Sequence, residues 1–297
     1  MKREFFYPQR NFAAIPEQYA DFETSRVVIL PIPYDSTTDW RSGSRDGPMA
    51  IIDASQYLEL YDHELDREIH LAGIHTLPEL EPSMKGPEQT VERVYNVASD
   101  LVQKGKLVAM LGGEHSLSVG MVKAFRERFD RLCVLQLDAH ADLRDEYQGT
   151  KYSHACVMRR VLECCPIVQV GLRTLSEEEH RFLAQNQMRP FLTQGHPLDQ
   201  PCLDEIVSAL SEEVYITIDL DVLDPSIMSA VSTPEPGGMG WYEILRVLRQ
   251  VAQQRHVVGF DLVELCPKEG PGSCAFLAAK LAYKLIGYAL SPLTPSF

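Results

Sequence analysis

Several features that would place the chain in a special class are absent from its 297 residues. No apolar run is long enough to cross a membrane, and no repeat, low-complexity tract or Pro/Gly/Ser-rich linker divides the sequence. The N-terminal stretch MKREFFYPQRNFAAIPEQ is charged and broken by prolines, so it lacks the apolar core of a secretory signal. We therefore expect a cytoplasmic protein with no membrane partner.

Basic residues and paired cysteines are also scarce. Lys and Arg number 28 against 42 Asp and Glu, which gives a net charge of −14. Nucleic acids and anionic membranes need a basic footprint, so this charge argues against both as partners and suits a small cationic substrate. The seven cysteines are odd in number and include no C-x-x-C pair. We interpret them as reduced thiols rather than as a disulfide framework.

What is present is an alternation of short apolar runs with longer segments of helical periodicity. Near-continuous apolar runs are typical of strands covered on both faces. They occur at Val27–Pro31, Leu107–Leu111, Leu132–Leu137, Ile167–Val170, Val214–Leu220 and Val257–Leu262, with a weaker one near Ile69–Ile74. Helical patterns occur at Pro87–Lys104, Leu117–Phe129, Trp241–Gln254 and Ala275–Leu290. This order predicts one α/β domain over residues 1–297, with a mostly parallel sheet and helices on both faces.

Three of the predicted strands lead into acidic and histidine residues. The segments are Gly112-Gly113-Glu114-His115-Ser116, Asp138-Ala139-His140-Ala141-Asp142 and Asp219-Leu220-Asp221. Functional groups of parallel sheets lie beyond the carboxyl ends of the strands. The strand period of two would start Asp138, His140 and Asp142 on one face and would align Asp219 with Asp221.

Carboxylates this close repel one another and are costly to bury unless a cation joins them. Four Asp and two His around one point have the composition of a two-metal site, in which the ions lie about 3.5–4 Å apart. Oxygen-rich ligation favours Mn²⁺ or a similar ion over structural zinc. Each motif alone has a plainer interpretation, because an Asp-x-Asp can cap a helix and a His after Gly-Gly is usually a loop residue. Their combination on three strands favours the metal site.

The motifs GGEHS, DAHAD and DLDVLDP, in that order, resemble the three metal motifs of the ureohydrolase (arginase/agmatinase) family. Three further segments resemble this family's glycine-rich N-terminal segment, its TPEPGG loop and its last active-site strand, namely Gly43–Pro48, Ser232–Gly238 and Gly259–Glu264. The resemblance runs through most of the chain. It implies an arginase-like three-layer α/β/α fold and, commonly in this family, a symmetric homo-oligomer.

The resemblance also implies two divalent ions per chain, with Mn²⁺ the favoured ion, and a role for each matching residue. One metal would be held by His115, Asp138, Asp142 and Asp219, and the other by Asp138, His140, Asp219 and Asp221, with Asp138 and Asp219 bridging. Glu264 matches the carboxylate that pairs with the guanidinium of the substrate. His154 matches the histidine that shuttles protons. Asp142 lies beside the hydroxide that bridges the two metals, and it would carry the proton of this hydroxide onward.

Elementary chemistry supports these roles. A fixed carboxylate such as Glu264 can hold a guanidinium and stabilise charge as its carbon becomes tetrahedral. The leaving amine must be protonated, which suits a histidine with a pKa near the operating pH. Taken alone, Glu264 would be interpreted as a solvated charge at a strand end, and His154 as a residue before the short helix Val157–Val161.

The chain departs from the family at three places, all outside the matched ligands. Glu114 stands where Asp is common, and Ile52 stands where an arginine is common. The segment Ser229-Ala230-Val231-Ser232 replaces the usual glycine-containing GTGTP approach to the TPEPGG loop.

The loop between Asp142 and His154, LRDEYQGTKYS, resembles agmatinases rather than arginases, which carry an Asn/Ser/Thr-rich loop for the amino-acid carboxylate. We therefore predict hydrolysis of agmatine to putrescine and urea, a step of polyamine biosynthesis. If the loop borders the pocket for the substrate's tail, an arginine carboxylate would meet Asp142, Asp145, Glu146 and Glu264. Guanidinobutyrate, arginine, other guanidino compounds and free guanidine remain open as substrates.

Two hypotheses from other classes remain. A haloacid-dehalogenase-type phosphatase also binds Mg²⁺ through an Asp-x-Asp at a strand end, but it would leave His115, Asp138, His140 and Asp142 without a role. A non-catalytic paralogue that only binds or assembles could lose metal ligands, and none is lost here.

Overall fold

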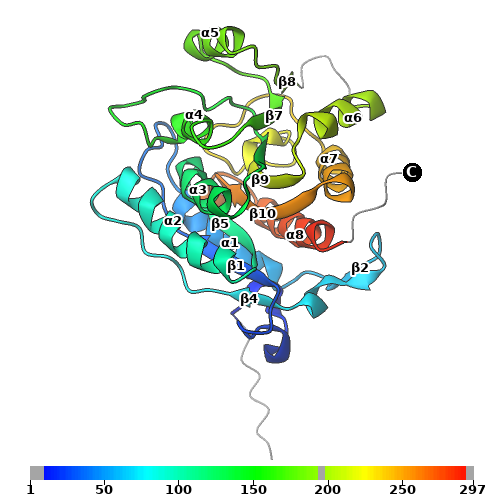
Figure 1. Ribbon diagram of the computed structural model, residues 1–297. Helices are drawn as coiled ribbons and strands as arrows, with labels where there is room; N and C mark the ends of the chain where they lie inside the picture. Colours follow the sequence, from blue (N-terminus) through cyan, green and yellow to red (C-terminus); the bar gives the residue numbers. More distant parts are fainter. Residues whose placement is uncertain (1–9, 193–197, 292–297) are drawn as a thin grey trace, which may run out of the picture.

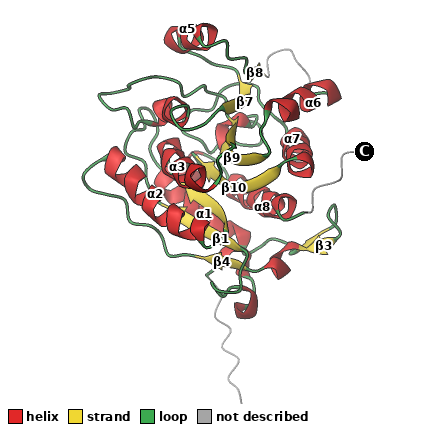
Figure 2. Ribbon diagram, viewed as in Figure 1, coloured by secondary structure: helices red, strands yellow, loops and turns green. Residues whose placement is uncertain are grey.

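The computed structural model describes residues 10–192 and 198–291. An eight-stranded parallel sheet runs through the molecule in the order β4-β1-β5-β10-β9-β6-β7-β8 (Figures 1 and 2). Its strands are β1 Val27–Ile32, β4 Ile74–Thr76, β5 Leu107–Gly112, β6 Leu132–Leu137, β7 Ile167–Leu172, β8 Phe191–Leu192, β9 Glu213–Asp219 and β10 His256–Val263. A small antiparallel hairpin, β2 Tyr61–Asp62 and β3 Arg67–Glu68, stands beside it.

Helices cover both faces of this sheet. The apolar cluster on one face includes side chains of α1 Gly47–Ser55, α6 Gln200–Ala209, α7 Trp241–Gln254 and α8 Gly272–Ala289. The cluster on the other face includes side chains of α2 Pro87–Gln103, α3 Ser118–Arg128, α4 Val157–Val161 and α5 Glu177–Gln185. The predicted three-layer α/β/α fold is confirmed. None of the helices in the described part of the chain is long and apolar enough to span a membrane.

The long strands are mostly apolar because both of their faces are covered. In β5, Leu107, Ala109 and Leu111 belong to one apolar cluster, and Val108 and Met110 belong to the other. Side chains alternate between the two faces of a strand, so each face needs its own set of apolar residues. This is why the six stronger strand predictions agree with the structure to within two residues at each end.

The weaker strand prediction, near Ile69–Ile74, is wrong in position. Ile69–Ala72 forms a short 3-10 helix, and β4 begins only at Ile74. The change of direction comes at Gly73, which has a φ of 77° and lies so close to Ser25 that a Cβ there would be 2.7 Å from the Ser25 Cα. Only glycine tolerates this combination at low cost, so the turn sets where β4 starts.

A row of buried polar side chains crosses four strands of the sheet one to three residues before the strand ends. Gln169, Gln136, Thr217 and Asp261 lie in register on the neighbouring strands β7, β6, β9 and β10. Thr217 donates a hydrogen bond to Asp261 at 2.6 Å, and Gln169 donates one to Gln136 at 2.6 Å. Because polar groups this deep are costly, their position directly under the strand ends marks that edge of the sheet as the place to seek function.

Candidate active site

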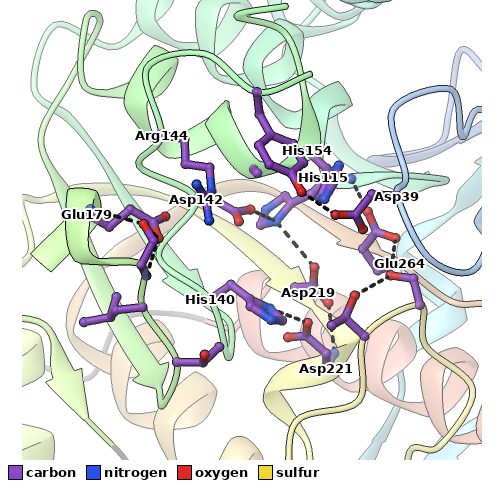
Figure 3. A pocket seen from close by; sticks show the side chains of 17 residues that line it. Asp39, His115, His140, Asp142, Arg144, His154, Glu179, Asp219, Asp221 and Glu264 are labelled. Atoms are coloured by element: carbon purple, nitrogen blue, oxygen red, sulfur yellow. Dashed lines mark hydrogen bonds and ion pairs between the residues drawn. The ribbon is translucent and has the colours of Figure 1, made fainter. Parts of the chain in front are cut away.

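The strand ends of β5, β6, β9 and β10 meet around a cavity of about 270 Å³. Figure 3 shows the acidic and histidine side chains that converge there from these separate strands. The cavity is lined by Asp39, His115, His140, Asp142, Arg144, Tyr147, His154, Ala155, Thr174, Leu175, Ser176, Glu179, Asp219, Asp221, Ser232, Thr233 and Glu264. All of the predicted site residues line this cavity except Asp138, which is fully buried beneath it.

The DAHAD segment does not continue the strand before it, although its alternating spacing predicts that it does. β6 ends at Leu137, and the strand period does not continue through Asp142, whose φ is 54°. The amide of His140 donates to Asp138 Oδ1 at 2.6 Å. The carbonyl of Asp142 accepts the amides of Met158 and Arg159 at 3.0 and 3.2 Å. The start of α4 therefore holds Asp142 in the left-handed conformation that turns its carboxylate into the site.

One group of candidate ligands surrounds the ring of His115. Its Nδ1 lies 3.0 Å from Asp142 Oδ2, 3.2 Å from Asp138 Oδ2 and 3.5 Å from Asp219 Oδ2. This nitrogen is buried and has no hydrogen-bond partner among the described residues. A buried lone pair facing three carboxylates fits a bound divalent cation better than it fits a hydrogen-bonded core.

The other ring nitrogen explains why Nδ1 faces the carboxylates. Nε2 of His115 lies 2.9 Å from the Thr217 hydroxyl, which itself donates to Asp261 at 2.6 Å. Because the proton of Thr217 goes to Asp261, its oxygen accepts from Nε2, and in the neutral ring Nδ1 carries no proton and is free to bind a cation. Hydrogen bonds of this kind orient the histidine ligands of metal sites. Asp261 lies in the Gly259–Glu264 segment, but no sequence pattern predicted its hydrogen bond with Thr217.

A second group of candidate ligands lies beside the first. His140 Nδ1 is 2.8 Å from Asp221 Oδ2 and 3.6 Å from Asp138 Oδ1. Ligand atoms fall within 4.8 Å of one another in two sets, His115 with Asp138 and Asp219, and Asp138 with His140 and Asp221. The two sets share Asp138, as expected of a bridging ligand. Asp219 belongs only to the first set, and it also accepts the amide of Asp221 at 2.9 Å.

The crowding of carboxylates raises the proton affinity of Asp142, Asp219 and His140. Burial and the neighbouring Asp138 raise the pKa of Asp142 to about 7, and burial with Asp221 and Asp138 raises the pKa of Asp219 well above its usual value. Although burial disfavours its charged form, the pKa of His140 is raised to about 12 by Asp221 and Asp138. So many carboxylates share their charge stably only when cations lie among them.

Glu264 closes the inner end of the cavity. It follows β10 with a φ of 67°, and its carboxylate accepts the amide of His115 at 2.7 Å and the Ser232 hydroxyl at 3.4 Å. No Lys or Arg pairs with it among the residues that the structure describes. Burial and the charge of Glu114 raise the pKa of Glu264 to about 8. A cation that enters the cavity would favour its ionised form.

His154 lies on the cavity wall, at the start of a 3-10 turn before α4. Its backbone amide donates to the Thr37 hydroxyl at 3.0 Å, and the edge of its ring meets Tyr147, with the centroids 5.9 Å apart. Burial lowers the pKa of His154, while the charges of Glu114 and Asp39 act to raise it. On balance the surroundings favour the neutral ring.

The loop between Asp142 and His154 does border the cavity, but through different side chains from those expected. Arg144 and Tyr147 line the wall, and Asp145 and Glu146 do not. Asp145 instead pairs with Arg160 at 2.6 Å on the outer side of the loop. The expectation that Asp145 and Glu146 crowd the pocket is therefore wrong, and for Asp145 the reason is the ion pair with Arg160 of α4, which holds its carboxylate away from the cavity.

Other wall residues come from segments that the sequence did not single out. Asp39 follows β1 and accepts the hydroxyl of Tyr147 at 2.5 Å, although the two residues are 108 positions apart. Glu179 stands on the opposite side of the cavity (Figure 3), where it accepts the amide of Leu143 at 3.0 Å and caps α5 through Ser176. Ile52, where the family commonly has an arginine, is a core residue of α1 and does not line the cavity.

Comparisons with known proteins agree with this site. The N(1)-aminopropylagmatine ureohydrolase of Synechocystis is 38% identical over 94% of this chain and 95% of its own length. The agmatinase of Pyrococcus horikoshii is 34% identical over 90% and 93%. The crystal structure of the agmatine ureohydrolase of Thermoplasma volcanium superposes with a TM-score of 0.85 at 31% identity, covering 96% of this chain and 95% of that one. The model of the arginase family matches residues 25–287. This match runs through every strand that ends in the site, and it confirms the resemblance found in the motifs: the chain belongs to the arginase family.

Proposed function

We propose that the protein hydrolyses the guanidino group of an agmatine-type compound and releases urea. The observation that carries this proposal is the buried carboxylate of Glu264, which has no cationic side chain paired with it in the described part of the chain and lies at the inner end of the cavity. A guanidinium would supply the missing positive charge through two parallel hydrogen bonds. The ligand sets around Asp138 lie beside this position.

The ligand sets fit two divalent ions. We propose His115, Asp138, Asp142 and Asp219 as the ligands of one ion, and Asp138, His140, Asp219 and Asp221 as the ligands of the other. Their oxygen-rich chemistry supports Mn²⁺. When bound, such a pair of ions lowers the pKa of water and supplies a nucleophile at neutral pH.

The remaining roles belong to side chains of the chain itself. Glu264 orients the guanidinium and stabilises charge as its carbon becomes tetrahedral. Asp142 lines the cavity next to the candidate ligand His115 and accepts a proton at its carboxylate. His154 donates a proton from its ring to the leaving amine nitrogen as the carbon–nitrogen bond breaks.

Agmatine is the substrate that we propose first, with putrescine and urea as its products. N(1)-aminopropylagmatine is the second candidate, because the Synechocystis relative carries that name. Both present a cationic tail, and the exposed carboxylate of Asp39 on the cavity wall suits an ammonium group. Arg144 is the one wall residue with a fixed positive charge, and its guanidinium already stacks over Tyr147, 5.0 Å from the ring centroid.

The deciding experiment measures urea released by the Mn²⁺-loaded protein from agmatine, N(1)-aminopropylagmatine, arginine, guanidinobutyrate and guanidine. We expect kcat/KM for the better agmatine-type compound to exceed that for arginine by at least about 10²-fold, a few kcal/mol of transition-state binding. Comparable values on arginine would overturn the agmatine-type assignment. Phosphate release from p-nitrophenyl phosphate without any urea would favour the phosphatase hypothesis, and no turnover of any compound would favour the non-catalytic paralogue.

We further propose that the whole chain forms one ureohydrolase-like domain acting in polyamine biosynthesis, and that it assembles as a homo-oligomer. A cytoplasmic location is supported by the free thiols of all seven cysteines.

A further inference from the structure

We propose that Glu114 and Thr37 form a relay that positions His154, with the imidazole proton held on Nδ1 and with Nε2 presented to the substrate. This inference rests on the proposed role of His154 as the group that protonates the leaving amine. It assigns a purpose to Glu114, the residue in GGEHS that differs from the Asp common in the family. Glu114 and Thr37 act through His154, so they are positioning residues.

Glu114 is a fully buried carboxylate whose hydrogen bonds all lead away from the metal ligands. It accepts the Thr37 amide at 2.7 Å, the Thr37 hydroxyl at 2.8 Å and the Ser116 hydroxyl at 2.5 Å. No Lys, Arg or His pairs with it among the described residues. A buried charge without a cation is costly, so its three donors are what make this position tolerable.

The Thr37 hydroxyl favours a proton on Nδ1 of His154. Its single hydrogen goes to Glu114, so its oxygen can only accept from other groups. It accepts the His154 amide at 3.0 Å, and the His154 Nδ1 lies 3.2 Å away. A favourable contact there requires a proton on Nδ1. The hydroxyl of Ser153, 3.3 Å from the same nitrogen, can accept from it as well.

The opposite ring nitrogen is the one available for chemistry. Nε2 of His154 has no hydrogen-bond partner in the described part of the chain, and the ring lines the cavity. When His154 is charged, Nε2 also carries a proton, which passes to the leaving nitrogen as that nitrogen takes the electron pair of the broken bond. Nδ1 keeps its proton throughout. The arrangement resembles a carboxylate that orients a catalytic histidine, with a hydroxyl placed between them.

The backbone explains why a glutamate reaches Thr37. Gly113 packs so tightly on the segment after β1 that a Cβ would lie 1.8 Å from the Tyr34 carbonyl oxygen. The amide of Glu114 donates to that same carbonyl at 2.7 Å. The two segments are thus held side by side, and the side chain of Glu114 spans the distance to Thr37. An Asp would be shorter by one carbon–carbon bond, about 1.5 Å.

The first test compares Thr37→Val with Thr37→Ser. Valine has the shape of threonine but lacks the hydroxyl, so we expect kcat to fall by about 10-fold or more, less than the roughly 10²–10⁴-fold expected on losing His154 itself. Serine restores the hydroxyl and should recover most of kcat. KM and the bound metal should be unchanged in both variants. An unchanged kcat in Thr37→Val would overturn the relay.

A double-mutant cycle separates positioning from a general structural effect. If Thr37 acts through His154, adding Thr37→Val to His154→Asn should lower kcat no further. Independent effects would multiply instead, and that outcome contradicts the proposal. Glu114→Gln keeps the length of the side chain and removes its charge. Among the groups that face His154, which are Glu114, Asp39, His140 and Tyr147, it removes one that raises the imidazole pKa. The alkaline fall of kcat should then move to lower pH.

A spectroscopic test is independent of turnover. Protein with ¹⁵N-labelled histidine, loaded with diamagnetic Zn²⁺, reports the tautomer of each neutral ring, and the His154→Asn variant assigns the signal. We expect the Nδ1–H form in the wild type and its loss in Thr37→Val. A wild-type His154 protonated on Nε2 alone would sink the relay even in an active enzyme. Absence of urea release with the expected tautomer would instead count against the proposed function.

Discussion

At the scale of single residues, the two candidate metal positions depend unequally on their ligands. Asp138 offers Oδ2 to the side of His115 and Oδ1 to the side of His140. Asp219 falls within one ligand set, although the family resemblance makes it a bridging residue. Substitutions therefore distinguish shared from unshared ligands, because losing a shared carboxylate weakens both ions.

We predict that Asp138→Asn lowers the content of both ions, whereas His115→Asn mainly lowers one. Elemental analysis of Mn²⁺-loaded protein after dialysis measures this directly. Asp219→Asn is the informative variant. If Asp219 bridges the two ions, as the family resemblance implies, both ions should be lost; if it binds one ion, as the ligand distances indicate, only one should be lost. A wild-type content of one ion or none per chain would contradict the dinuclear centre.

The proposed proton donor makes a separate prediction. His154→Asn removes the ring without touching a proposed metal ligand, so the metal content should stay at the wild-type value. Turnover should fall by about 10²–10⁴, the usual contribution of general acid–base catalysis. If turnover is unchanged, His154 has no part in the reaction.

At the scale of elements, the strand ends and the residues directly after them supply the candidate metal ligands, and other connecting segments supply walls of the pocket. The segment after β1 brings Thr37 and Asp39, and the loop after β6 brings Arg144 and Tyr147. Far from this edge, the β2–β3 hairpin is tied to α8 by a buried ion cluster. Lys284 is 3.0 Å from Asp62 and pairs with Glu64, which also accepts the Tyr288 hydroxyl at 2.8 Å.

We predict that Lys284→Met destabilises the protein by about 3–5 kcal/mol, because it leaves the buried carboxylate of Asp62 without its cation, whereas the half-buried Glu64 keeps its ion pair with Arg249. Burial alone would raise the pKa of Asp62 and Glu64, but hydrogen bonds with Lys284 lower both. Groups with a lowered pKa contribute stability above the unfolded value of about 4 and lose it as the pH falls through the folded value. Urea unfolding at pH 7 and below pH 4 should therefore show a smaller difference between variant and wild type in acid.

As control, Lys280→Met removes a lysine of the same helix that has no ion pair among the described residues. It should leave stability close to that of the wild type. An equal loss of unfolding free energy in both variants would mean that the ion pairs of Lys284 do not account for the effect.

At the scale of the whole molecule, six of the 42 Asp and Glu residues line the cavity where the strands end, so their charges repel one another there. Bound cations relieve this repulsion only in the folded state, because only folding assembles the ligands. Each ion therefore stabilises the fold by mass action, by roughly 2.7 kcal/mol when its free concentration is 100 times the Kd.

We predict a lower Tm after removal of metal by a chelator, and recovery when Mn²⁺ is returned. Differential scanning calorimetry of the wild type and of Asp138→Asn provides the comparison, since the variant should respond weakly to the ion. The same Tm for the wild type with and without Mn²⁺ would show that the ligand cluster does not bind the ion in solution.

The sequence by itself determined the sheet, the four predicted helices and the set of candidate ligands. Each of these depends on neighbours in the chain: the apolar runs of β5 and β6, the periodicity of α7, and the motifs directly after the strands. Parallel strands bring their carboxyl ends to one edge, so His115 and Asp219 had to lie near one another. The family match then confirmed the reaction class that these motifs indicate.

Only the tertiary structure decided which groups touch across long separations. Glu114 reaches Thr37, 77 positions away, and Tyr147 reaches Asp39 because three separate loops pack over the same sheet edge. The pairing of Asp145 with Arg160 holds this carboxylate away from the cavity, which the composition of the loop between Asp142 and His154 did not predict. Hydrogen bonds and ion pairs are short-ranged, so they depend on exact placement that a local pattern does not encode, whereas strands and motifs follow from residues adjacent in the chain.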